Sequence, residues 1–142
     1  MVKQLSVFLQ NKSGKIAAIT DALAKADIDI RALSIADTTD FGILRMLVSD
    51  IDGATRVLAD QNCIVGVNEV VVVAVPDAPG GLAKMLSLMA HNGIDIEYMY
   101  SLIDRGAKDA YMVFRVSDEE KLLALLGGNG LHAVPPHTLG LH

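Results

Sequence analysis

The chain has 142 residues and a net charge of −5 with no run of like charges, so it lacks the basic surface that nucleic-acid binding requires. Its single cysteine excludes an internal disulfide, and its longest apolar run, Val70–Val75, is too short for a membrane helix of about 20 residues. The N-terminus alternates polar and apolar residues and lacks the continuous apolar core of a secretory signal. We therefore expect a cytoplasmic protein without nucleic-acid or membrane partners.

The first half of the chain predicts six elements in the order strand, helix, strand, strand, helix and strand. Apolar and polar residues alternate over Leu5–Leu9, which is typical of a strand with one buried face. Ile16, Ile19 and Leu23 are spaced three or four apart, as on the apolar face of a helix. The remaining elements are a strand over 28–35, a returning strand over 41–48, a helix that starts at 50–53 and a strand from residue 64.

The second half repeats this order. Its elements are predicted at Val70–Val75, Leu82–His91, Ile94–Leu102, Ala110–Val116, Glu119–Leu126 and Leu131–Val134. The order β-α-β-β-α-β is the split-βαβ or ferredoxin-like arrangement, in which both helices lie on one face of an antiparallel sheet. We therefore expect an α+β fold of two such units in tandem, residues 1–69 and 70–142, with Asn68 and Glu69 as the longest linker between them.

An internal repeat is most evident where the first helix of each half begins. Asn11–Ile16 is followed by Asp29 at the same spacing at which Asp77–Leu82 is followed by Asp95, and the two copies are offset by 66 residues. Such a repeat indicates two copies of one supersecondary unit. Two equivalent loop-to-helix junctions favour two related binding positions over one catalytic centre, and the sequence offers no nucleophile–base pair or cluster of metal ligands. We therefore expect no enzymatic activity, no metal and no cofactor.

These motifs resemble those of a known family. A βαββαβ unit with Asn-x-x-Gly or Asp-x-Pro-Gly before its first helix and Ile-Asp-Ile at its second strand looks like an ACT domain. The resemblance is strongest over Asn11–Ser34 and Asp77–Tyr100, which makes the chain similar to stand-alone tandem ACT proteins. ACT domains are small-molecule sensors, most often of amino acids. The resemblance implies a ligand that lies where the first loop and helix of one unit face a neighbouring unit.

The resemblance also assigns polar contacts to particular residues. In amino-acid-binding members these contacts come from the position three before the glycine and from the start of the second strand, which here are Asn11, Asp29, Asp77 and Asp95. This chain departs from the family pattern by carrying aspartate at both second-strand positions, where a neutral amide is familiar. The candidate ligand-binding residues are Asn11, Lys12, Ser13, Gly14, Lys15, Ile16, Asp29, Asp77, Pro79, Gly80, Gly81, Leu82, Asp95, Tyr98 and Tyr100.

The chemistry of the two turns suits a zwitterion on physical grounds as well. The start of a helix leaves backbone N–H groups unpaired and carries partial positive charge, which stabilises a carboxylate. Gly14, Gly80 and Gly81 permit a close approach to that backbone. A carboxylate such as Asp29 or Asp95 would hold the ammonium group.

The turn residues also have a purely structural interpretation. Asn11, Ser13 and Asp77 are all good helix-capping residues. Pro79 is a favoured residue at the start of a helix. The local pattern alone therefore does not separate capping from ligand binding.

The strand residues have alternatives of the same kind. Asp29 and Asp95 are also consistent with the solvent-facing side of an alternating strand. Tyr98 and Tyr100 share one strand face, where they either line a pocket or pack on the sheet with their hydroxyl groups at its rim.

The apolar run Val70–Val75 bears on assembly and function. It is apolar on both alternating faces, which predicts that both faces are covered. Because large apolar patches seldom stay exposed on monomers, we expect a homodimer. We expect a non-catalytic amino-acid sensor that regulates amino-acid metabolism. The alternative is a regulatory subunit that docks on a metabolic enzyme such as acetolactate synthase.

Overall fold

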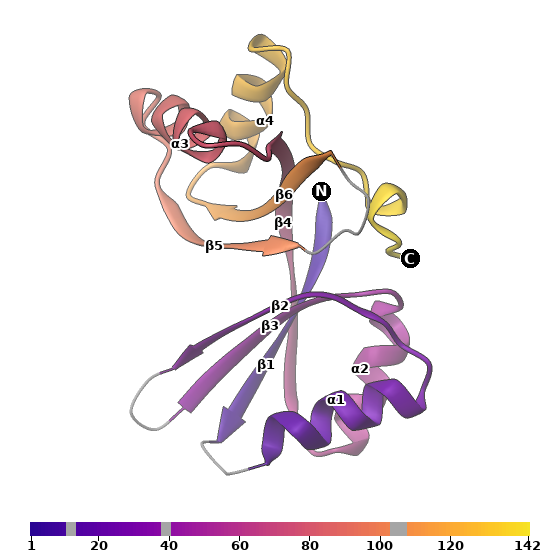
Figure 1. Ribbon diagram of the computed structural model, residues 1–142. Coiled ribbons are helices and arrows are strands. Elements are labelled where there is room, and N and C mark those ends of the chain that lie inside the picture. The colour runs from indigo at the N-terminus through magenta and orange to yellow at the C-terminus, as the bar shows by residue number, and fades with distance from the viewer. Residues whose placement is uncertain (11–13, 38–40, 103–107) are drawn as a thin grey trace. The chain divides into compact units, whose positions relative to one another are not determined.

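The computed structural model describes residues 1–10, 14–37, 41–102 and 108–142. Its strands are β1 (Val2–Gln10), β2 (Ile30–Asp37), β3 (Phe41–Val48), β4 (Ile64–Pro76), β5 (Ile96–Leu102) and β6 (Asp109–Val116). Its helices are α1 (Lys15–Lys25), α2 (Ile51–Asp60), α3 (Gly81–His91), α4 (Glu119–Gly128) and a short 3₁₀ helix, η1 (Pro136–Leu139) (Figure 1). None of the helices in these ranges has the length and apolarity needed to cross a membrane.

The chain folds into two compact units. The first unit comprises Lys3–Asn68 and the C-terminal residues Gly140–His142. The second unit comprises Glu69–Leu139 and the N-terminal residues Met1–Val2. Both contain two α-helices and antiparallel strands in the order that the repeat predicts, apart from the last strand of the second unit, and the predicted α+β fold of two tandem βαββαβ units is confirmed.

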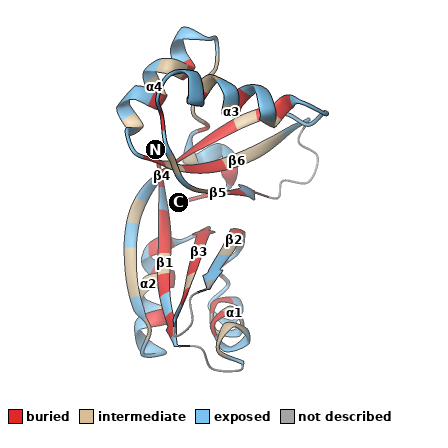
Figure 2. Cartoon of the chain, turned by 90° about the vertical axis from the view of Figure 1, so that its left-hand side faces the viewer, coloured by how far each residue is buried: buried red, intermediate tan, exposed pale blue. Residues whose placement is uncertain are grey.

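In the first unit the strand order is β2-β3-β1-β4, and β3 pairs antiparallel with both of its neighbours. Leu44 on β3 lies opposite Val7 on β1 and Ile35 on β2. The alternating apolar residues of β1 and β3 pack against the apolar faces of α1 and α2, and Figure 2 shows how far β1 and β3 are buried. The fully buried residues of this core include Leu5, Val7, Ile19, Leu23, Leu44, Met46 and Leu58.

In the second unit the strand order is β4-β6-β5, again antiparallel. Alternate residues of β4 and β6 pack against α3 and α4 in a core that includes Val71, Val73, Met85, Met89, Phe114, Leu122 and Leu126. Val70 and Val72, which alternate with these core residues along β4, are fully buried too. The prediction that this apolar run is covered on both faces is therefore confirmed, with Ala74 half-buried.

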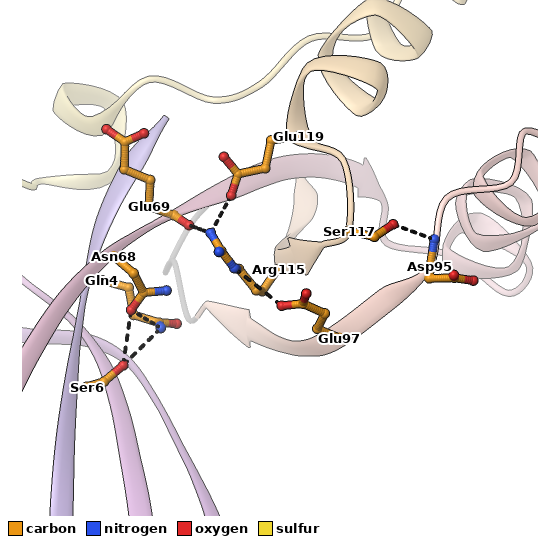
Figure 3. A network of polar contacts seen from close by, with 9 residues as sticks. All are labelled: Gln4, Ser6, Asn68, Glu69, Asp95, Glu97, Arg115, Ser117 and Glu119. Atoms are coloured by element: carbon orange, nitrogen blue, oxygen red, sulfur yellow. Dashed lines mark hydrogen bonds and ion pairs between the residues drawn. The ribbon is translucent and has the colours of Figure 1, made fainter.

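Asn68 and Glu69, the longest linker that the sequence allows between the halves, lie inside β4, which is one continuous strand of 13 residues. The Asn68 side-chain oxygen accepts hydrogen bonds from Gln4 Nε2 and Ser6 Oγ, each at 3.2 Å (Figure 3). Polar side chains of β1 therefore donate to the side-chain oxygen of Asn68 within the sheet.

The predicted last strand, Leu131–Val134, is wrong as a regular strand. It is reduced to one isolated bridge between Ala133 and Val73, supported by a 2.7 Å hydrogen bond from Val134 N to Val72 O. Pro135 and Pro136 follow at once and have no N–H groups to donate to a ladder, so pairing stops and η1 begins.

Candidate functional site

The turns before α1 and α3 have the same backbone geometry. Gly14 has φ +81° and ψ 0°, and Gly80 has φ +87° and ψ −7°, both in the left-handed region. Their carbonyl oxygens accept hydrogen bonds of 3.0 Å from the N–H groups of Ala18 and Lys84 respectively. Because this conformation favours glycine, each turn presents backbone without a side chain at the start of a helix.

The turn before α3 is closed by its own backbone. Ala78 N donates to Pro76 O at 2.9 Å, and Gly81 N donates to Ala78 O at 3.0 Å. A Cβ atom at the buried residue Gly81 would lie 2.1 Å from Pro76 O, so this glycine is required by chain packing. Pro79 and Gly80 are exposed, so they form the part of the turn that a ligand can reach.

The turn before α1 is described from Gly14 onward, and the candidate residues Asn11, Lys12 and Ser13 lie outside the described residues. Lys15 is half-buried, and its Nζ donates to the carbonyl oxygen of Gln61 at 3.4 Å. Ile16 packs against the core of the first unit, as Leu82 does in the second. The apolar candidates of both turns therefore anchor their helices.

The capping interpretation is wrong for the turn before α3. The N-cap residue of α3 is Gly80, which has no side chain to donate or accept, and Pro79 precedes the cap. Within the described part of the chain, no donor reaches the exposed carboxylate of Asp77. Asp77 is therefore open to solvent beside a turn whose helix it does not cap.

Asp29 and Asp95 are held by their backbones. The N–H of Asp29 donates to Ser49 Oγ at 2.9 Å and its C=O accepts from Ser49 N at 2.9 Å. The matching distances between Asp95 and Ser117 are 3.3 Å and 3.0 Å (Figure 3). Both carboxylates are exposed, just before β2 and β5, but Asp29 lies 3.3 Å from Nη1 of Arg31. Among the described residues, nothing pairs with the carboxylate of Asp95.

The two tyrosines of β5 share one face, as their spacing predicts. The rings of Tyr98 and Tyr100 are stacked, with centroids 6.5 Å apart and an interplanar angle of 14°. Tyr100 is buried and Tyr98 is half-buried, and they lie opposite Val113 and Arg115 on β6. The pair forms an aromatic surface on the sheet, and packing buries most of the Tyr100 side chain.

Arg115, opposite Tyr98 on β6, is the centre of a cluster of polar contacts that the sequence analysis does not identify. Arg115 Nη1 donates to the carbonyl oxygen of Glu69 at 2.9 Å and to the carboxylate of Glu119 at 2.5 Å, and its Nε lies 3.4 Å from Glu97 (Figure 3). The arginine thus joins β4, β5, β6 and the start of α4. The signal that would have found it is a single charge inside the predicted strand Ala110–Val116.

Comparison with known proteins relates the chain to proteins of the same architecture. A family model described as "ACT domain pair" matches residues 1–138. Protein BT0572 from Bacteroides thetaiotaomicron is 40% identical, with a TM-score of 0.89, over 98% of this chain and 95% of that one. No match was found among curated proteins.

More distant solved structures share the fold. The regulatory subunit of aspartate kinase from Thermus thermophilus is 16% identical, with a TM-score of 0.63 over 89% of this chain and 91% of that one. The corresponding subunit from Thermus flavus is 17% identical, with a TM-score of 0.57 over 89% and 90%. At these identities, the likeness extends to the fold alone.

Proposed function

The chain belongs to the ACT domain pair family, and from that premise we propose that it is a non-catalytic sensor that binds an amino acid and thereby regulates amino-acid metabolism. The ligand carboxylate would meet backbone N–H groups at the turn before α1 or α3. Its ammonium group would meet one of the aspartates at the start of β2 or β5.

The observation that carries this proposal is the matched pair of left-handed glycine turns. Gly14 and Gly80 lie 66 residues apart, and no described residue would come within 4 Å of a Cβ atom at either position. The space beside both backbones is therefore open. An open, positively polarised helix start favours a carboxylate at each turn.

The second unit supplies the better acidic partners. Asp77 and Asp95 are exposed and have no partner among the described residues, whereas Asp29 is already paired with Arg31. An ammonium group would have to displace that guanidinium to reach Asp29. We therefore propose that the two positions differ in affinity and that contacts from the second unit dominate.

Calorimetry on protein purified free of bound metabolites tests the proposal directly. Titration with each proteinogenic amino acid is expected to give saturable heat for at least one of them. Asp95→Asn is expected to weaken that binding by about tenfold, because it removes the charge that faces the ammonium group. Asp109→Asn, at an exposed aspartate of the same unit, is the matched control and should leave the affinity unchanged.

A wild-type protein that shows no heat with any proteinogenic amino acid would contradict the ligand assignment. Docking on a metabolic enzyme would then be the better interpretation, and co-purification of a stoichiometric large partner from cell extract would support it. Equal losses in Asp95→Asn and Asp109→Asn would instead indicate a general charge effect and reject the contact at Asp95.

We also propose that the protein is a homodimer. Phe8 and Phe41 are 47% and 56% exposed on the sheet of the first unit. Phe8 alternates along β1 with the core residues Val7 and Leu9, and Phe41 of β3 lies opposite Gln10, which is on the same face of β1 as Phe8. Both therefore lie on the face that α1 and α2 leave uncovered. Exposed aromatic residues on an uncovered sheet face support burial against a second chain.

A further inference from the structure

The second unit contains a cavity of about 300 Å³ that is separate from the exposed apex of its turn. It lies where the end of β4, the first turns of α3 and the segment after α4 meet. Its lining residues are Ala74, Val75, Pro76, Gly81, Lys84, Met85, Leu88, Asn129 and Leu131. The volume is at the lower end of the range for small-molecule sites, about 300–1,000 Å³.

The internal repeat shows how this cavity differs from the matching region of the first unit. Gly81 is the first residue of α3 and Asn129 is the C-cap of α4, and their counterparts in the first unit are Lys15 and Gln61. In the first unit, Lys15 Nζ reaches across to the carbonyl oxygen of Gln61 at 3.4 Å. In the second unit Gly81 has no side chain to make this contact. The first unit also has a hollow at the matching place, lined by Ala18, Ala22 and Gln61, but Asp21, Lys25 and Asp60 line it too, so it carries charges of both signs.

The same comparison explains the chemistry of the lining. Lys84 and Leu88 on α3 stand where the first unit has Ala18 and Ala22 on α1. Among the residues that line the cavity, Lys84 is the single charged one, and the others supply mainly apolar surface. Within the described part of the chain, Lys84 takes part in no ion pair. The cavity therefore combines an apolar interior with an ammonium group that has no counter-charge.

We propose that this cavity binds a small aliphatic carboxylate of about four to six carbons, a size that suits a pocket of this volume. The alkyl chain lies among Val75, Met85 and Leu88, and the carboxylate meets the ammonium group of Lys84. A free amino acid is disfavoured, because no acidic side chain lines the cavity to receive an ammonium group. The site is independent of the amino-acid site proposed above, and its ligand is of a different charge type.

Hexanoate is the probe, and the Met85 methyl group is the reporter. In protein labelled at methionine methyl groups, sodium hexanoate at low ionic strength is expected to shift the Met85 signal in a saturable way. Lys84→Gln is expected to weaken binding by about tenfold, since it removes a charge-assisted contact. Lys121→Gln, at an exposed lysine on α4, is the matched control and should leave hexanoate affinity unchanged.

Two further variants test the position and the charge type of the ligand. Leu88→Phe is expected to fill the cavity and abolish the Met85 shift, whereas Leu88→Ala should retain it. A Met85 response that is equal for hexanoate and hexylamine would overturn the assignment of a carboxylate. An unchanged hexanoate affinity in Lys84→Gln would overturn the proposed contact, and this exposed substitution stays informative even where Leu88→Phe fails to fold.

Discussion

Gly80 and Gly81 are adjacent in the sequence, but different physical constraints act on them. Gly80 is exposed and left-handed, and a Cβ atom there would meet nothing within 4 Å. Gly81 is buried, and a Cβ atom there would lie 2.1 Å from the carbonyl oxygen of Pro76. The first constraint is a conformational preference, whereas the second is a collision with the main chain.

This difference predicts unequal costs for the same substitution. Gly80→Ala is expected to lower the free energy of unfolding by about 1–2 kcal/mol, the cost of a left-handed conformation for an L-residue. Gly81→Ala should cost more, because Pro76 and the strand end must move to admit the methyl group. Urea denaturation of each variant measures both values.

Gly127→Ala is the control for these two substitutions. Gly127 lies in α4, and a Cβ atom there would meet nothing within 4 Å, so alanine should be neutral or stabilising. If Gly80→Ala lowers stability more than Gly81→Ala, the packing role of Gly81 is wrong.

At the scale of single residues, the sequence identifies residue types better than the roles they take. It marks both glycines of the repeat, because their spacing is copied, yet the local pattern does not separate capping by Asp77 from ligand binding. The left-handed Gly80 at the start of α3 excludes Asp77 as the cap. The serines that hold Asp29 and Asp95 were also visible, as repeated Val-Ser-Asp triplets at 48–50 and 116–118. Their contacts join segments about 20 residues apart, which local patterns do not report.

At the scale of elements, Arg115 joins three strands and a helix, so its replacement should lower the stability of the second unit as a whole. Arg115→Met keeps the apolar stem of the side chain but leaves the carboxylate of Glu119 and the carbonyl of Glu69 without this donor. We expect the free energy of unfolding to fall by about 1–3 kcal/mol, the range for a partly buried group that loses its hydrogen-bond partner. Thermal or urea unfolding provides the measurement.

Arg56→Met, at an exposed arginine of α2, is the matched control and should change stability little. The double variant Arg115→Met with Glu119→Gln should recover part of the loss, because it removes the unpaired charge. Equal stability of Arg115→Met and wild type would show that the cluster contributes nothing to the fold.

The order of elements is predictable from sequence because each helix and strand has its own period of apolar residues. The structure departs from these expectations where pairing between distant segments decides the outcome. Asn68 lies inside β4, where its side-chain oxygen accepts hydrogen bonds from side chains of β1 that are more than 60 residues away in the sequence. Leu131–Val134 pairs with β4 at a single bridge, and the prolines after it prevent the ladder from continuing.

At the scale of the whole molecule, duplication gives two units with one architecture and different contents. The offset that aligns Gly14 with Gly80 also aligns Lys15 with Gly81 and Ala18 with Lys84. The first pair preserves the turn, whereas the other two remove a spanning side chain and add a charge beside a cavity. Conserved backbone geometry therefore coexists with divergent chemistry, which supports distinct roles for the two units.

At the same scale, the proposed homodimer can be tested through the mass of the protein in solution. If the uncovered sheet face of the first unit is buried in a homodimer, light scattering should give about twice the mass of the 15.1 kDa chain. Phe8→Ser with Phe41→Ser should shift that mass toward a single chain, because both substitutions remove aromatic area from this face.

Val67→Ser is the control. Val67 is 51% exposed, but it alternates with Asn68, whose side chain contacts Ser6 on the face of Phe8, so Val67 lies on the other face of the sheet. A wild-type mass of one chain over a wide concentration range would reject the dimer. A dimer that survives in the double variant would place the interface on another surface.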